Sequence, residues 1–178
     1  TITVEDNVAP VAVCQNITVQ LDNSGNATIT ALQVNNGSND ACGIQSLALN
    51  ITTFNCANVN GNTVILTVTD VNSNTSTCSA NVTIEDNVDP IAVCQNVTVQ
   101  LDITGNGSTT AAAVNNGSSD NCAIASLALS QTAFVCSEVG ANTEILTVTD
   151  VNGNSTTCTA TITVEDNVAP VAVCQNIT

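Results

Sequence analysis

TITVEDNVAPVAVCQNIT, at positions 1–18, returns unchanged at positions 161–178. A near copy, NVTIEDNVDPIAVCQNVT, begins halfway between them at Asn81, so the sequence repeats with a period of 80 residues. Self-similarity at a fixed period is the signature of a repeat architecture, and a unit of this length is the size of a small domain. The sequence therefore predicts tandem structural units.

The recurring EDN-x-x-P segment sets the predicted domain boundaries. We expect residues 1–8 to end a preceding repeat, 9–88 and 89–168 to form two full repeats, and 169–178 to begin a third. Because both ends of the chain fall inside a unit, we expect the sequence to be a window of a longer array.

Short runs of alternating hydrophobic and polar residues fill each repeat. In ITVQL, positions 17–21, Ile17, Val19 and Leu21 share one face of a strand, and VILTVT at 64–69 alternates in the same way. Asn-, Gly- and Asp-rich turns separate such runs, and we find six or seven strands per repeat and no helical period. This pattern is typical of sandwiches. The predicted fold is all-β: tandem immunoglobulin-like β-sandwich domains, stapled by disulfides and arranged end to end.

The composition excludes several classes of partner. The chain contains no Lys, Arg or His and has a net charge of -15. Nucleic acids and anionic membrane surfaces are excluded, because binding to phosphates requires cationic side chains. No apolar run approaches the roughly 20 residues of a membrane helix. The hydrophobic content of 43% nevertheless indicates a globular chain.

Nine cysteines in 178 residues indicate an oxidising compartment. A zinc site is disfavoured, because CxxC spacing and His are both lacking. Cys42 and Cys56 are symmetric about Leu49, so a hairpin turning there would place them opposite each other. Four cysteines allow three pairings, and the sequence alone does not choose among them. Cys174 should have its partner in the continuation of the array.

In an immunoglobulin-like sandwich the first and last strands run side by side, which favours joining the first cysteine of each repeat to the fourth. The favoured bonds are Cys14–Cys78, Cys42–Cys56, Cys94–Cys158 and Cys122–Cys136.

Twelve of the fifteen acidic residues recur at the repeat period. They are Glu5, Glu85, Glu165, Asp6, Asp86, Asp166, Asp22, Asp102, Asp40, Asp120, Asp70 and Asp150. In an immunoglobulin-like topology, the loops that carry Asp120 and Asp150 lie at the N-terminal end of their domain. We expect Asp22 of one domain to approach Glu85, Asp86 and these two residues across the junction.

Clustered carboxylates without cationic neighbours repel one another. Ca²⁺ relieves this repulsion, because it accepts six to eight hard oxygen ligands in flexible geometry, so a calcium site is predicted at the junction. Mg²⁺ is disfavoured, because it takes few protein ligands. The alternative is that these residues only form turns and solubilise the chain, which suits Asp22 in LDNSGN and Asp70 in TDVNSN.

The repeated motifs resemble a known family. EDNVAP at 5–10, GSNDAC at 37–42, FNC at 54–56, TVTDVNSN at 67–74 and CSANVTIED at 78–86 resemble HYR-like immunoglobulin-type repeats. These repeats fill giant Bacteroidetes surface adhesins, such as SprB-like gliding adhesins and related type IX-secreted proteins. The resemblance covers the whole chain. It implies export to the cell surface and a fibre-like role in adhesion or gliding. The linker also resembles the calcium-binding linkers of cadherins, with a shorter acidic motif.

The residue types present distinguish three candidate functions. Acid–base chemistry in an enzyme would rest on carboxylates alone, since His, Lys, Tyr and Arg are lacking. A calcium-dependent glycan-binding module would lack Trp and Tyr as sugar platforms. The favoured function is a structural stalk or spacer of a long extracellular adhesin or filament. Its partners are neighbouring repeats of the same chain and other chains in a fibre.

Overall fold

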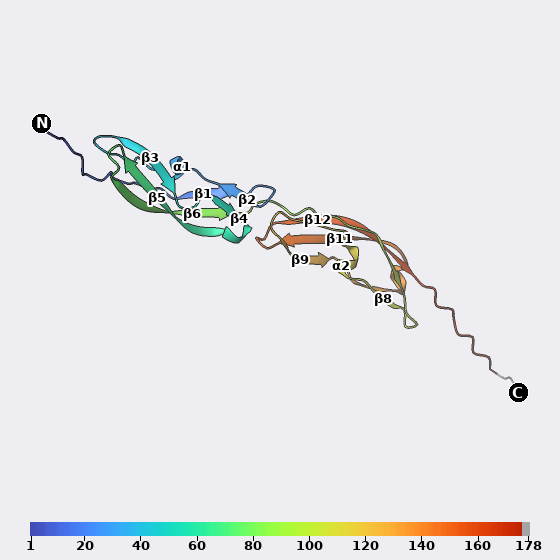
Figure 1. The fold of residues 1–178 in the computed structure, drawn as a ribbon. Helices are drawn as coiled ribbons and strands as arrows, with labels where there is room; N and C mark the ends of the chain where they lie inside the picture. Colours follow the sequence, from blue (N-terminus) through green and yellow to red (C-terminus); the bar gives the residue numbers. More distant parts are fainter. Residues whose placement is uncertain (176–178) are drawn as a thin grey trace. The chain divides into compact units, whose positions relative to one another are not determined.

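The computed structural model describes residues 1–175, and the chain divides into two compact units, Thr1–Val88 and Asp89–Thr178 (Figure 1). Each unit contains one β-sandwich of the expected all-β class. The finer division into four segments stays a prediction, and residues 176–178 of the predicted third repeat lie outside the described part.

The first unit has six strands, one short helix and one 3-10 turn. They are β1 Ile17–Gln20, β2 Asn26–Thr28, α1 Ala31–Val34, β3 Ile44–Leu49, β4 Thr53–Asn55, η1 Cys56–Asn58, β5 Asn60–Asp70 and β6 Thr75–Glu85. The six strands agree with the predicted six or seven per repeat, and α1 adds one short helical turn. Four residues are too few to show a helical period, and Thr30 with Gln33 caps this single turn.

Two sheets form the sandwich. One has the strand order β1-β6-β5-β3, and the other pairs β2 with β4. The first and last strands, β1 and β6, are neighbours and run parallel, with Ile17 opposite Val82. The longest strand pairing is that of the antiparallel β5–β6 hairpin, which turns between Asp70 and Thr75. The end of the unit at this turn is called the entry end, and the opposite end, at the turn of residues 21–26 and the end of β6, is called the exit end.

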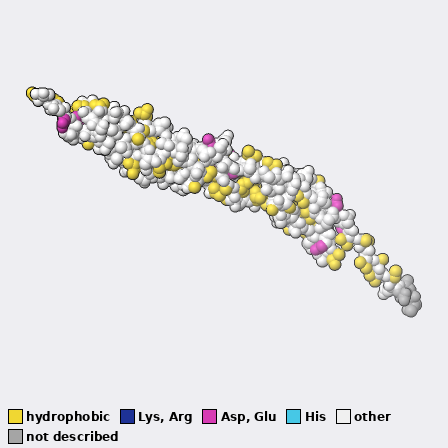
Figure 2. Space-filling view, viewed as in Figure 1, with side chains coloured by type: hydrophobic (Ala, Val, Ile, Leu, Met, Phe, Trp, Pro, Cys, Tyr) yellow, Lys and Arg dark blue, Asp and Glu magenta, His cyan; other side chains and the backbone are white. Residues whose placement is uncertain are grey.

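The core lies between the two sheets and follows the alternation of the sequence. Val64, Leu66 and Val68 of β5 are fully buried, and the residues between them are more exposed. Phe54 on β4 is also buried, which confirms that this aromatic side chain fills the core. The outer surface is largely uncharged, and Figure 2 shows acidic groups scattered among polar side chains.

The second unit repeats this arrangement. Its elements are β7 Val97–Gln100, β8 Asn106–Ser108, α2 Ala111–Val114, β9 Ile124–Leu129, β10 Ala133–Val135, η2 Cys136–Glu138, β11 Gly140–Asp150 and β12 Ser155–Glu165. The sheets have the orders β7-β12-β11-β9 and β10-β8. Its entry end is the β11–β12 turn, and its exit end is the turn of residues 101–106. In the described residues, no helix is long and apolar enough to span a membrane.

Glu144 is the main departure of the second core from the first. It occupies the position of Val64, is 9% exposed and is hydrogen-bonded to the hydroxyl of Ser130. We expect the double change Glu144→Val and Ser130→Asn, which restores the residues of the first unit, to stabilise the second unit by about 1 kcal/mol, since a buried polar group is replaced by an apolar one. Calorimetry would show a higher second melting transition, and an unchanged or lower one would contradict the expectation.

Each unit has a disulfide between the segment before its first strand and its last strand. Cys14 is bonded to Cys78, and Cys94 to Cys158, with a Cα–Cα distance of 5.8 Å in both. These are two of the bonds that the strand arrangement predicted. Each closes a loop with a sequence separation of 64 residues.

The other predicted pairs, Cys42–Cys56 and Cys122–Cys136, are wrong, because the thiols of Cys42 and Cys136 are free. The prediction assumed a hairpin near Leu49. The chain instead leaves β3 for β4, which pairs with β2 in the other sheet. Cys42 therefore lies at the entry end and Cys56 at the exit end. An 11-residue strand such as β5 spans roughly 35 Å, far beyond the roughly 7 Å Cα separation that a disulfide tolerates.

Candidate metal centre

Asp70 organises the turn at the entry end. It is the last residue of β5, and its side chain is fully buried. Its Oδ1 accepts hydrogen bonds of 2.8 Å from the backbone nitrogens of Asn72 and Asn74, and its Oδ2 accepts one from the Asn74 amide at 2.8 Å. Burial raises the pKa of the Asp70 carboxyl, but these hydrogen bonds outweigh burial and hold the pKa below its ordinary value of 3.8.

Asp40 reaches the same end from the loop between α1 and β3. Its Oδ2 accepts hydrogen bonds from the backbone nitrogens of Cys42 at 2.8 Å and Gly43 at 3.3 Å. The carbonyl of Gly43 accepts a hydrogen bond from Val71 in the β5–β6 turn. The loop is thereby fixed beside the turn that Asp70 organises.

Asp6 comes from the EDN-x-x-P segment that precedes the sandwich. Its backbone carbonyl accepts a 3.0 Å hydrogen bond from the Asn74 amide, and its Oδ1 accepts one from the backbone nitrogen of Val8. Asn74 thus connects the incoming segment to Asp70 and the hairpin turn. Asn74 was not among the predicted site residues, although TDVNSN and TDVNGN repeat this Asn four residues after the Asp.

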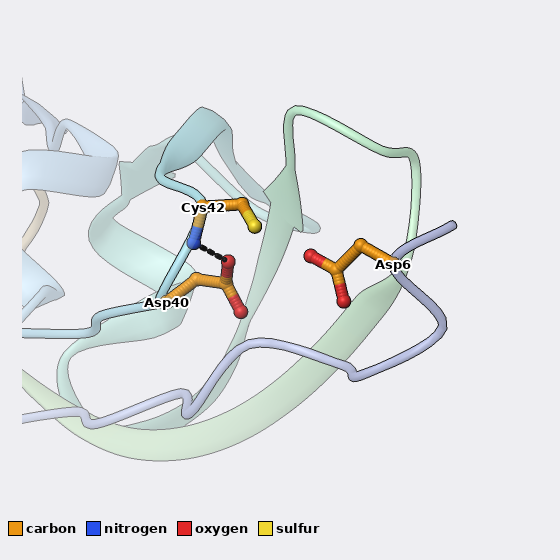
Figure 3. Close-up of side chains that lie close together, drawn as sticks. All are labelled: Asp6, Asp40 and Cys42. Atoms are coloured by element: carbon orange, nitrogen blue, oxygen red, sulfur yellow. Dashed lines mark hydrogen bonds between the residues drawn. The ribbon is translucent and has the colours of Figure 1, made fainter. Parts of the chain in front are cut away.

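Asp6, Asp40 and Cys42 converge at the entry end (Figure 3). One ligand atom of each lies within 4.8 Å of the others. A hydrogen bond to Asp6 and the charge of that carboxylate raise the pKa of the Cys42 thiol, with smaller contributions from burial and from the charges of Asp40 and Asp70. Cys42 therefore lies beside negatively charged carboxylates.

The second unit gathers Asp120 and Asp150 at its entry end. A carboxylate oxygen of one lies within 4.8 Å of a carboxylate oxygen of the other. Asp150 is 2% exposed and accepts hydrogen bonds from Asn152 and Asn154, while Asp120 Oδ2 accepts one from the backbone nitrogen of Cys122. The other oxygen, Asp120 Oδ1, is shielded from solvent and has no hydrogen-bond partner.

The remaining predicted ligands are spread over other positions. Asp22 lies at the exit end, where it accepts hydrogen bonds from the backbone nitrogens of Ser24 and Asn26, as the turn-forming alternative expects. Glu85 lies at the same end and accepts a hydrogen bond from the Gln20 amide. Glu5 is exposed.

In the second unit, Asp102 and Glu165 repeat the exit-end positions of Asp22 and Glu85. The pKa of Asp102 is lowered, and the largest cause is the hydrogen bond that its carboxylate accepts from the Thr104 hydroxyl. Asp166 accepts a hydrogen bond from Val168. The approach of the exit-end acids and Asp86 to Asp120 and Asp150 stays a prediction.

The donors at the entry end suit a hard cation. Asp6, Asp40 and Asp70 offer carboxylate oxygens in the first unit. In the second unit, Asp120 Oδ1 is a carboxylate oxygen that is buried without a hydrogen-bond partner, as expected of an oxygen available to a cation. Oxygen ligands of this kind favour Ca²⁺ or Mg²⁺. The Cys42 sulfur is a soft ligand and is not expected to bind either ion. The residues therefore fit a calcium ion held by oxygen atoms alone.

Removing Asp70 isolates its role in the turn. We expect Asp70→Ala to lower the melting temperature of the first unit by roughly 5–10 °C at neutral pH, because three hydrogen bonds lose their acceptor. Since the folded-state pKa of Asp70 is depressed, its contribution is complete above the ordinary pKa of 3.8 and is lost as the pH falls through the lower, folded value. The difference between wild type and variant should therefore shrink below about pH 4.

Melting curves recorded across pH test this expectation, with Asp89→Ala as the control, because Asp89 is exposed. A difference that stayed constant at acidic pH would show that the charge of Asp70 does not matter.

Comparison with known proteins gives distant structural likenesses. No family model and no curated protein sequence matches the chain. Human protocadherin-24 EC1-2 is similar with a TM-score of 0.46 and 11% identity, over 90% of this chain and 100% of that chain. Extracellular cadherin domains 1-5 of protocadherin gamma B2 are similar with a TM-score of 0.42 and 13% identity, over 92% of this chain and 41% of that chain.

Extracellular cadherin domains 1-4 of protocadherin gamma B7 give a TM-score of 0.40 and 11% identity, over 89% of this chain. The chain spans about half the length of that structure, 51%. Likenesses at these identities and TM-scores carry no argument about function, which must come from the residues of each unit.

Proposed function

We propose that the chain is a spacer segment of a long extracellular adhesin or filament, stiffened by disulfides and by calcium. The observation that carries the proposal is that two consecutive repeats build the same disulfide-stapled sandwich and gather acidic groups at its entry end. Disulfides persist in oxidising environments, which supports an extracellular location.

Calcium at the entry end would act on the linker. Asp6 belongs to the segment that precedes the repeat, whereas Asp40 and Asp70 belong to the sandwich itself. An ion bound by all three would fix the incoming segment on the repeat, and Pro10 further restricts the backbone there. Such a site favours a stiff connection over a flexible one.

The motif resemblance refines this proposal. HYR-like repeats of Bacteroidetes adhesins would make the chain part of a type IX-secreted surface fibre that supports adhesion or gliding. A calcium-dependent glycan-binding module is the rival function. Its usual aromatic platform is lacking, because Phe54 and Phe134, the only aromatic residues, are both buried.

Small-angle scattering of the 178-residue chain with Ca²⁺ and with EDTA tests the proposal. We expect EDTA to broaden the distribution of interatomic distances while the far-ultraviolet circular dichroism stays unchanged, since linkers loosen and sandwiches stay folded. The double variant Asp40→Asn, Asp120→Asn should show the same broadened distribution of distances even when Ca²⁺ is present. The charge-matched control is Glu5→Gln with Asp89→Asn, which alters exposed acids only. Identical scattering in Ca²⁺ and EDTA would contradict calcium stiffening.

A further inference from the structure

The second and third cysteines of each repeat lie at opposite ends of the sandwich, the second at the entry end and the third at the exit end. Cys42 lies at the entry end, where Val71 of the β5–β6 turn donates a hydrogen bond to the carbonyl of neighbouring Gly43. Cys136 lies at the exit end of the second unit, with its Sγ 3.7 Å from the carbonyl oxygen of Gly105. Within one repeat, the fold therefore places these two cysteine positions at opposite ends of the sandwich.

The exit-end cysteine lies at a hollow of about 830 Å³. One side of the hollow is the turn from Asp102 to Gly105, and the other is the departing chain at Val168 and Pro170. Gly105 has φ of +78°, and a Cβ there would collide with the Cys136 sulfur. The turn thus leaves space for this sulfur atom at an open surface.

The oxidation states of these cysteines differ between the repeats. Cys42 and Cys136 are exposed free thiols. Their counterparts one period away, Cys122 and Cys56, are disulfide-bonded. Both positions therefore accept a disulfide, and geometry forbids this bond inside one sandwich. A disulfide partner for either free thiol would therefore have to come from another copy of the repeat.

We infer that Cys136, at the exit end of one copy, forms a disulfide with Cys42, at the entry end of another copy. The bond is directional, because it joins unlike ends. Two thiols lose two protons and two electrons, and an oxidant of the disulfide class is reduced to two thiols. The inference rests on the proposed end-to-end spacer but needs no calcium.

A mixing experiment tests the direction of the bond. Cys174 is also free and exposed, so every protein carries Cys174→Ser. One variant adds Cys42→Ser and keeps Cys136, and the other adds Cys136→Ser and keeps Cys42. They differ in tag length, and they are mixed in equal amounts and oxidised with glutathione disulfide. Non-reducing electrophoresis then separates the three dimers.

We expect the mixed dimer to exceed clearly the half of all dimers that random pairing gives. The same mixture in urea is the matched control and should give the random ratio. Because the chain has no Lys or Arg, the mixed dimer is cut at Glu residues, and mass spectrometry should find Cys136 joined to Cys42. A random ratio in the folded state, or an excess of either symmetric dimer, would overturn the inference.

The chain with Cys42 and Cys136 intact provides a second measurement. In the Cys174→Ser background it should form a ladder of multimers, which either single change, Cys42→Ser or Cys136→Ser, reduces to dimers. The absence of a ladder would count against the inference. This result is independent of scattering in Ca²⁺ and EDTA, so failure of the disulfide and failure of calcium stiffening are distinguishable.

Discussion

Replacing Cys14 and Cys78 by serine is expected to lower the free energy of unfolding of the first unit by about 4 kcal/mol. The bond closes a loop with a sequence separation of 64 residues, and its loss frees the unfolded chain. A domain of this size has a total stability of about 5–15 kcal/mol. The melting temperature should fall by roughly 15–30 °C, or the unit should fail to fold.

Calorimetry measures this effect, with the second unit as an internal reference, because its Cys94–Cys158 bond remains. The matched control is Cys42→Ser, which removes an exposed free thiol and should change the stability of the first unit by less than about 0.5 kcal/mol. A loss below about 1 kcal/mol in the double variant would contradict the chain-entropy argument.

Calcium is expected to raise the free energy of unfolding by about 1.4–2.7 kcal/mol at 10 mM, for dissociation constants of about 0.1–1 mM. The physical reason is that Ca²⁺ binds the folded entry end, where it neutralises the repulsion between Asp6 and Asp40, and does not bind the unfolded chain. Asp40→Asn should abolish the gain in the first unit, because it removes a ligand while keeping the size of the side chain.

Thermal melting in Ca²⁺ and in EDTA measures the gain. Asp89→Asn is the control, since Asp89 is exposed and outside the cluster, and it should keep the full effect. Equal stabilisation of wild type and Asp40→Asn would place the ion elsewhere.

The strand pattern was predictable because it depends on local alternation. The runs at 64–69 and 78–84 fall within β5 and β6, and their buried residues are those that the alternation selects. The Cys14–Cys78 bond followed from the neighbouring first and last strands of the sandwich. These features depend on periodicity and on a common topology, and both leave a signal in the sequence.

The Cys42–Cys56 prediction failed because symmetric spacing about Leu49 does not distinguish a hairpin from a crossover between sheets. Residues 50–52 carry the chain from β3 to β4 in the other sheet, and that choice depends on long-range packing. The contribution of Asn74 was hidden for a similar reason. Its contact with the carbonyl of Asp6 spans 68 residues, and only the folded chain brings the two together.

Isothermal titration of the 178-residue chain with Ca²⁺ tests the central claim most directly. We expect saturable binding in the range of about 0.1–1 mM that is lost in the Asp40→Asn, Asp120→Asn variant and kept in the Glu5→Gln, Asp89→Asn control. Absence of binding up to about 10 mM, or equal binding by both variants, would contradict a calcium site at the entry end of the repeat.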